Sequence, residues 1–120
     1  MFVQCSLVVA RISVAQVSDD QIAGELQEGF LTLYERSGAT HAIVDLQDVT
    51  YMSSMGIGPL LALSRKVRER TGRFILCSMS PFVESVMHAT KLIGAAHGSP
   101  ATFEHQADVP AAVQSLYRGE

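Results

Sequence analysis

The sequence predicts a single α/β domain built on a mostly parallel sheet, and two observations lead to this fold class. The chain has 120 residues, of which 48% are hydrophobic and 18% charged, and this suits one compact domain with one core. Runs of strand character also alternate with helical segments, in the order strand, helix, strand, helix, strand, helix, weak strand, helix. Such alternation is typical of parallel strands joined by right-handed crossovers. No repeat or linker divides the chain, so we expect one domain over residues 1–120.

The first third predicts one or two strands and a helix. Residues 2–14 are rich in Val, Leu and Ile and predict strand, with a kink near Ala10. Residues 18–20 read Ser-Asp-Asp, which supplies N-cap candidates and acidic side chains for a first helical turn. An apolar stripe at helical spacing follows, formed by Ile22, Leu26, Phe30 and Leu33. Gly38 ends this helix, because glycine readily adopts the left-handed conformation of a C-terminal cap.

The middle of the chain predicts a buried strand and a second helix. Residues 42–46 form a short apolar run between turn-forming residues, and residues 47–51 read as a connecting loop. Ser53 opens the second helix. Pro59 belongs in its first turn, where a missing backbone donor does no harm. The sequence Thr-Gly at residues 71–72 ends it.

The last third predicts a strand, a short helix, a weak strand and a final helix. Residues 73–79 contain another buried strand. The pair Ser80-Pro81 combines a hydroxyl cap with proline at the first helical position, and this helix ends before Gly94. A weak strand is expected near residues 101–104, followed by a helix that Asp108 caps.

Charge and hydropathy exclude several classes of protein. The net charge of −3 argues against a dedicated nucleic-acid binder, which would be strongly basic. No apolar run approaches the roughly 18 residues of a membrane-spanning helix, and no basic segment leads the N-terminus as in a signal peptide. Two cysteines, Cys5 and Cys77, are too few for a disulfide-stapled scaffold and are expected to be inert core thiols. We therefore expect a cytoplasmic protein with no membrane or nucleic-acid partner.

Motifs for common chemistries are missing from the sequence. Leu61 stands where a dinucleotide fingerprint needs its third glycine, and neither a P-loop nor a G-x-S-x-G elbow is present. The histidines have no paired ligand spacing, so no metal site is expected; they are His41, His88, His97 and His105. Five of the nine basic residues fall in residues 65–73, which a solvated helix end explains and an acidic partner would also suit.

The most informative stretch is residues 43–58, which places paired serines at the start of a helix. Backbone N–H groups at a helix start lack partners and carry partial positive charge. A hydroxyl there either caps the helix or, once phosphorylated, has its phosphate stabilised by the helix dipole. From this chemistry alone, Ser53 or Ser54 is simply an N-cap. Gly56 and Gly58 would keep the first turn slim, so that another protein could approach the backbone closely.

This stretch resembles the STAS domain of bacterial anti-sigma factor antagonists. The resemblance covers residues 41–94 best and rests on three features: the strand-end pair Asp45-Leu46, the apolar lead-in at residues 49–52, and the glycine turn at residues 56–58. A strand that runs into a Ser-Pro turn adds to it. The resemblance implies a mixed, mostly parallel sheet of about four to five strands, with about four helices mainly on one face.

The resemblance also implies a function and a site. A serine kinase that is itself the anti-sigma factor would phosphorylate Ser54. Unmodified protein would bind that partner and free a sigma factor, and phosphorylated protein would release it. The partner contact would include Asp45, Ser53, Met55, Gly56 and Ile57. Such a domain catalyses nothing and needs no cofactor or metal, because ATP and Mg²⁺ belong to the kinase.

Two residues depart from the family pattern and keep other functions open. Ser53 stands where the family has an acidic residue, and Met55 stands where it has a small one. These departures would suit an interaction scaffold of the same fold that is never phosphorylated. A third possibility is an enzyme or small-ligand sensor that uses Asp45 and Ser54. Asp45 itself is either a partner contact or a strand-end carboxylate bonded to loop amides.

Overall fold

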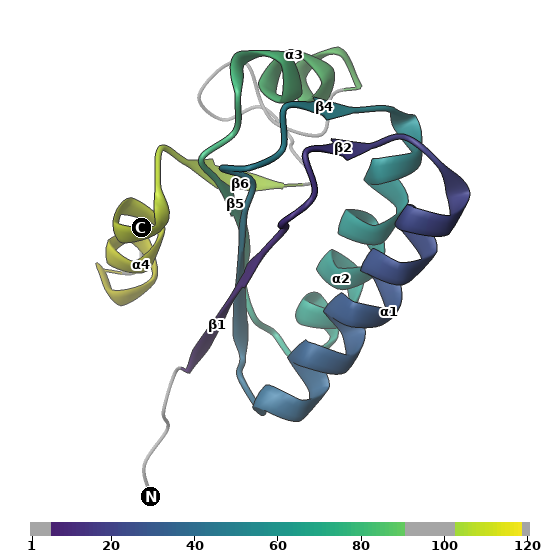
Figure 1. Ribbon diagram of the computed structural model, residues 1–120. Helices are drawn as coiled ribbons and strands as arrows, with labels where there is room; N and C mark the ends of the chain where they lie inside the picture. Colours follow the sequence, from purple (N-terminus) through teal and green to yellow (C-terminus); the bar gives the residue numbers. More distant parts are fainter. Residues whose placement is uncertain (1–5, 91–102, 119–120) are drawn as a thin grey trace, which may run out of the picture.

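A four-stranded parallel sheet forms the centre of the protein in the computed structural model, which describes residues 6–90 and 103–118. The strands are β1 (Leu7–Arg11), β3 (His41–Asp45), β5 (Phe74–Cys77) and β6 (Glu104–Gln106). Their order in the sheet is β1-β3-β5-β6, and each neighbouring pair is parallel (Figure 1). The expected parallel α/β domain is confirmed. The antiparallel pairing implied by a mixed sheet does not occur in the part of the chain described.

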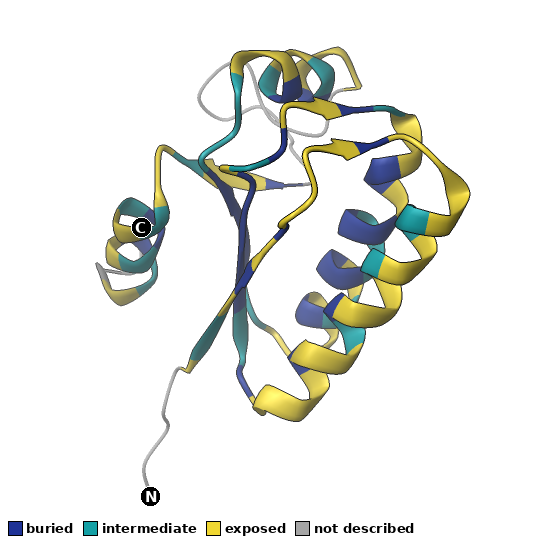
Figure 2. Ribbon diagram, viewed as in Figure 1, coloured by how far each residue is buried: buried dark blue, intermediate teal, exposed yellow. Residues whose placement is uncertain are grey.

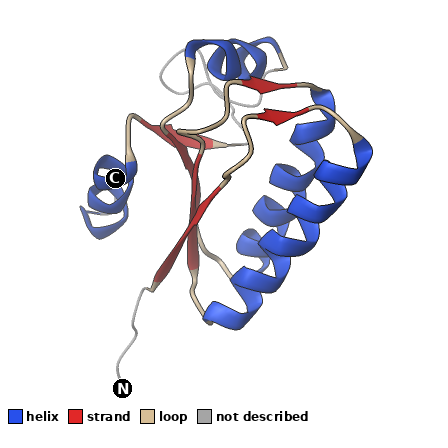
Figure 3. Cartoon of the chain, viewed as in Figure 1, coloured by secondary structure: helices blue, strands red, loops and turns tan. Residues whose placement is uncertain are grey.

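The helices surround this sheet unequally. Helices α1 (Asp20–Ser37) and α2 (Ile57–Glu69) lie side by side along one face (Figures 1 and 3). Helix α4 (Val109–Arg118) covers the opposite face, and α3 (Pro81–Ala89) sits beyond the carboxyl ends of the strands (Figure 1). Near α3, a second sheet pairs β2 (Gln16–Val17) with β4 (Tyr51–Met52), and the short 3-10 helix η1 (Ser54–Gly56) leads into α2.

Local sequence chemistry sets the helix ends as predicted. The side chain of Asp19 accepts a hydrogen bond from the Ile22 amide at 2.8 Å and so caps α1. Gly38 ends that helix with a left-handed φ of 67°. Two further predicted caps are present: Ser80 accepts from the Val83 amide at 3.2 Å, and Asp108 from the Ala111 amide at 2.9 Å. Helix α2 differs from the prediction, because η1 separates it from Ser53, no side chain caps its first turn, and it ends at Glu69 rather than at residues 71–72.

The core is divided by the sheet into a large and a small part. Buried side chains of α1, α2 and α3 share one cluster with the sheet, so three of the four helices do pack mainly on one side. The smaller cluster joins Ile43, Ile75 and Cys77 to Ala112 of α4. Figure 2 shows α2 turning a largely buried side inward, while the outer side of α1 is exposed. Among the described residues, no helix is long and apolar enough to cross a membrane.

Three expected details were wrong. Leu33 is 43% exposed, whereas Tyr34 is buried and donates from its hydroxyl to the Thr40 carbonyl at 2.7 Å. Position 34 lies four residues after Phe30, so it continues the buried stripe more directly than position 33. Residues 51–52 form a strand rather than the end of a loop, and the last strand lies at 104–106 rather than 101–104. Residues 101–102 and Gly94 lie outside the described residues.

Candidate functional site

The paired serines lie at the carboxyl edge of the sheet, on a loop held by the small second sheet. Strand β3 ends at Asp45, and the chain then passes through β4 into η1. The Ala15 carbonyl accepts a hydrogen bond from the Thr50 amide at 2.8 Å, and the Val17 carbonyl accepts one from the Ser53 amide at 3.0 Å. The segment before α1 therefore fixes the backbone that presents the serines.

The two serines have different environments, although they are neighbours in sequence. The side chain of Ser53 accepts from the Met55 amide at 3.2 Å and reaches the Val17 carbonyl at 3.5 Å. Ser53 is half-buried, and it is the residue that caps η1. Ser54 is exposed, and its hydroxyl makes no hydrogen bond with any residue that the structure describes. One serine thus stabilises the helix start, and the other offers a free hydroxyl beside it.

Gly56 and Ile57 support the site from within. A Cβ at position 56 would lie 2.5 Å from Cγ of Met52 and 3.1 Å from Cγ1 of Val17. Gly56 is buried in an ordinary right-handed conformation, so it is required for close packing under the small sheet. Ile57 is also buried. Of the two glycines expected to keep this turn slim, Gly56 is packed against Met52, and Gly58 has nothing within 4 Å of its Cβ position.

Asp45 is a structural carboxylate in this arrangement. Its side chain is buried, and Oδ1 accepts from the Gln47 amide at 2.9 Å. This bond turns the chain out of β3 and explains why a buried carboxylate is tolerated there. Asp48 instead forms an exposed two-bond ion pair with Arg11, with Nε to Oδ2 at 3.0 Å and Nη2 to Oδ1 at 3.1 Å.

Exposed apolar side chains accompany Ser54 at this end of the molecule. Met55 is 41% exposed, and the rings of Tyr51 and Phe82 stack with a centroid distance of 5.2 Å. The sequence interpretation missed both aromatic residues. Phe82 could have been found as the first apolar residue after a Ser-Pro cap, where a helix start faces solvent. Tyr51 could have been found from its alternation with the buried Met52.

Reactive and metal-binding groups do not gather within the described ranges. No group of three or more His, Cys, Asp or Glu side chains there could hold a metal ion. The Cys77 thiol donates weakly to the Val44 carbonyl, and burial raises its pKa to about 11, so it stays protonated. Cys5 and His97 lie outside the described residues.

The basic segment at residues 65–73 is not a single free patch. Lys66 pairs with Glu35 at 3.1 Å, and the Arg70 guanidinium lies 4.7 Å from the centre of the Tyr34 ring. Arg73 pairs with Glu104. Since these cations have partners within the chain, they stabilise the fold where they stand.

Comparison with known proteins defines the class. The family model of the STAS domain matches residues 8–104, and the chain belongs to this family.

Solved structures of similar fold include anti-sigma factor antagonists. A Thermotoga maritima protein assigned to that class superposes with a TM-score of 0.74 and 17% identity over 92% of this chain and 88% of its own. SpoIIAA of Bacillus, an anti-sigma factor antagonist, gives 0.64 and 20% identity over 100% and 96% in its unphosphorylated form. Its phosphorylated form gives 0.60 and 19% identity with the same coverage.

Proposed function

We propose that this protein is an anti-sigma factor antagonist that acts by binding, with Ser54 as the phosphate acceptor of a partner kinase. The observation that carries the proposal is the exposed, unbonded hydroxyl of Ser54 beside the capping hydroxyl of Ser53. A kinase needs an accessible hydroxyl, and Ser54 is accessible while Ser53 is engaged. The existence of SpoIIAA in phosphorylated and unphosphorylated forms, on a similar fold, supports the same function here.

Phosphorylation at Ser54 is expected to change the surface rather than the fold. A phosphate adds about −1.5 to −2 charges at pH 7. The N-terminal end of the helical segment that starts at Ser54 tolerates this charge, because its free N–H groups carry partial positive charge. The Ser53 cap does not involve the Ser54 hydroxyl and can persist.

The added charge would act on a partner through the exposed apolar side chains at this end of the molecule. Met55, Tyr51 and Phe82 are the groups that a protein partner would bury. A phosphate at the same interface must be desolvated, which is unfavourable against an apolar or acidic surface. A difference of about 3 kcal/mol in binding free energy would weaken affinity about 100-fold, enough to release a partner.

The structure favours revised roles for the predicted contact residues. Met55 and Ser54 are available to a partner as side chains, whereas Asp45, Gly56 and Ile57 are buried and would act by holding the loop. This distribution also disfavours a catalytic or small-ligand site at Asp45 and Ser54. Asp45 accepts from the Gln47 amide, and Ser54 is exposed, with no base among the described residues bonded to its hydroxyl.

Phosphopeptide mass spectrometry on protein from its own cells tests the proposal. The tryptic peptide of residues 37–65 contains both serines, so fragmentation must separate them. Phosphate on Ser54, lost in Ser54→Ala and kept in Ser53→Ala, is the expected result. Phosphate on Ser53 alone, or an unmodified peptide under several growth and stress conditions, would refute the acceptor role.

The second candidate function is a constitutive interaction scaffold, which the exposed Met55 at a family small-residue position favours. Affinity capture with matched baits separates the two functions. A partner that binds the wild type and Ser54→Ala but not Ser54→Glu supports the switch. A partner that binds all three equally supports the scaffold.

A further inference from the structure

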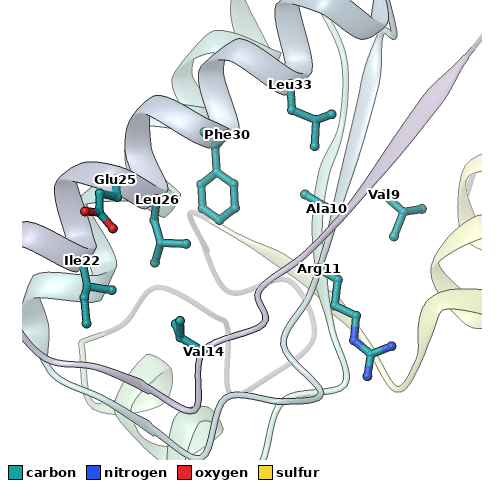
Figure 4. A pocket seen from close by; sticks show the side chains of 10 residues that line it. Val9, Ala10, Arg11, Val14, Ile22, Glu25, Leu26, Phe30 and Leu33 are labelled. Carbon is teal, nitrogen blue, oxygen red and sulfur yellow. The ribbon is translucent and has the colours of Figure 1, made fainter.

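An apolar groove lies between the edge strand β1 and helix α1, and Ser54 is not among the residues that line it. Its volume is about 330 Å³, and Figure 4 shows side chains of both elements lining it. The residues that form its apolar surface are Ala10, Val14, Ile22, Leu26, Phe30 and Leu33. No residue of the loop from Asp45 to Ile57 contributes to it. The groove therefore requires an explanation of its own.

The backbone beside this groove has an open hydrogen-bonding edge. Strand β1 is the terminal strand of the main sheet, and no strand of the described residues pairs with its outer side. The Ser6 carbonyl and the Ile12 amide both bond toward β3. Because alternate residues of a strand direct their backbone groups to opposite sides, Leu7, Val9 and Arg11 direct theirs outward.

The usual protections of an edge strand are weak here. Proteins guard such edges with proline, bulges or charged side chains. Strand β1 reads Leu-Val-Val-Ala-Arg, and its only charge, Arg11, is held by both carboxylate oxygens of Asp48. Val9 is 40% exposed, and Leu33 across the groove is 43% exposed. An open strand edge and an exposed apolar groove therefore occur together.

The charge on this surface is negative. Glu25 lines the groove, and Glu28 lies one turn further along α1. Within the described chain, neither carboxylate forms an ion pair, and the Gln21 amide is a distant neighbour of Glu25 at 3.4 Å. Arg11, the cation among the residues that line the groove, is paired with Asp48. A ligand that suits this surface carries positive charge next to an apolar group.

We propose that an extended segment of a partner protein adds to the outer edge of β1 as a further strand. Backbone groups of Leu7, Val9 and Arg11 would pair with it, which is a common mode of peptide recognition. Side chains two positions apart in a strand point to the same face. The segment would therefore place an apolar residue in the groove and, two positions away, a Lys or Arg beside Glu25. This proposal does not depend on phosphorylation of Ser54.

Selection from a displayed library of linear eight-residue peptides tests the proposal with the full chain as bait. Enriched peptides should share an apolar residue and a Lys or Arg at a spacing of two. For a synthetic peptide of the enriched sequence, Glu25→Gln should weaken affinity about two- to fivefold through one lost surface ion pair. Leu33→Glu should weaken it at least about tenfold, because it places a charge at the apolar groove. Methylation of the alternate peptide amides that face β1 should abolish binding, because these amides form the hydrogen bonds to the strand edge.

Matched controls locate the binding. Glu69→Gln removes an exposed acid of α2 that does not line the groove, and Ser54→Glu alters the proposed phosphate site; neither should change the affinity. Leu33 is exposed, so Leu33→Glu should keep the thermal unfolding midpoint of the wild type. The proposal is overturned if no peptide is enriched, if enriched peptides are acidic, or if the methylated peptide binds as well. Self-association that Leu33→Glu abolishes would assign the edge to a second copy and would also overturn it.

Discussion

The two ends of the central sheet are built in opposite ways. At the amino end, Gly72 packs against the backbone of Thr40, and Arg73 donates to the carboxylate of Glu104. At the carboxyl end, Gly56 packs against the flexible side chain of Met52, and Ser54 makes no bond with the described residues. At the amino end the close contact is with backbone, whereas at the carboxyl end it is with a side chain, beneath a loop that keeps exposed groups. In open α/β sheets, ligands bind at the carboxyl ends of the strands. The exposed groups of this loop lie at that same end of the sheet.

The largest effect should come from filling the space at Gly72. A Cβ there would overlap the Thr40 carbonyl oxygen, and backbone cannot move aside as a side chain can. Gly72→Ala should lower the free energy of unfolding by about 3 kcal/mol. Gly58→Ala is the control, because it meets nothing within 4 Å and should be neutral or stabilising. Urea unfolding measures both, and equal stability of the two variants would contradict the contrast between the ends.

The second effect concerns the Arg73 cluster. Arg73 donates from Nε to Glu104 at 3.0 Å and from Nη2 to the Ser115 hydroxyl at 3.0 Å, which joins β5 to β6 and α4. Arg73→Ala removes all of these bonds and should lower the free energy of unfolding by about 2 kcal/mol. The loss is limited to this size because Glu104 is half-exposed and solvent screens its charge. Lys66→Ala removes a more exposed pair and should change it by less than about 0.5 kcal/mol. If thermal unfolding gave equal losses of stability for Arg73→Ala and Lys66→Ala, the Arg73 cluster would contribute no more than an exposed ion pair.

A smaller effect is expected at Gly56, where the neighbouring atoms belong to side chains. Gly56→Ala should lower the free energy of unfolding by about 1 to 1.5 kcal/mol, because the atoms that its Cβ would meet belong to the side chains of Met52 and Val17 rather than to backbone. The two positions should also be coupled, so that Met52→Ala destabilises the Gly56→Ala variant less than it destabilises the wild type. Additive losses in urea unfolding would mean that the strain lies elsewhere.

The two serines give the sharpest comparison within the site. Ser53→Ala removes the cap on the Met55 amide and should lower the free energy of unfolding by about 1 kcal/mol. Ser54→Ala should change it by less than about 0.5 kcal/mol, since its hydroxyl is exposed. Chemical denaturation checks both, and a larger loss for Ser54→Ala would reverse their assigned roles.

The smallest effect is a pH dependence at the amino end. Burial, helped by the charge of Arg73, lowers the pKa of His41 from its usual 6.5, and Nδ1 accepts from the Arg73 amide at 2.9 Å. The unfolded chain therefore takes up a proton before the folded protein does. Stability should be complete above about pH 6.5, fall as the pH drops below it, and level off below the folded pKa. Unfolding measured at about pH 8 and pH 5.5 should show a smaller loss in His41→Asn, whose side chain can still accept the bond.

Local chemistry made much of the fold predictable. Capping residues such as Asp19, Ser80 and Asp108 determine helix starts through bonds to amides two or three residues away, so sequence alone locates them. The alternation of strands and helices likewise predicts a parallel sheet, because parallel strands need crossovers. The position of the paired serines at a helix start follows from the same local rules.

Non-local contacts account for what the sequence did not reveal. Strands β2 and β4 have two residues each, too few to show a period, and pair across more than 30 positions. That pairing also separates the two serines, because Val17 bonds to the amide and the hydroxyl of Ser53, and so fixes the residue whose side chain caps the Met55 amide. The burial of Gly56 under Met52 depends on the same pairing.

The bond between Ser53 and Val17 spans 36 positions of the chain, so the loop that presents Ser54 exists only once distant segments have come together. A short peptide around Ser54, or a nascent chain still lacking its partner strands, would not display the hydroxyl in this geometry. For a kinase that recognises the presented loop, the substrate is the folded molecule. Only folded molecules would then be phosphorylated in a cell, and misfolded copies would remain unmodified.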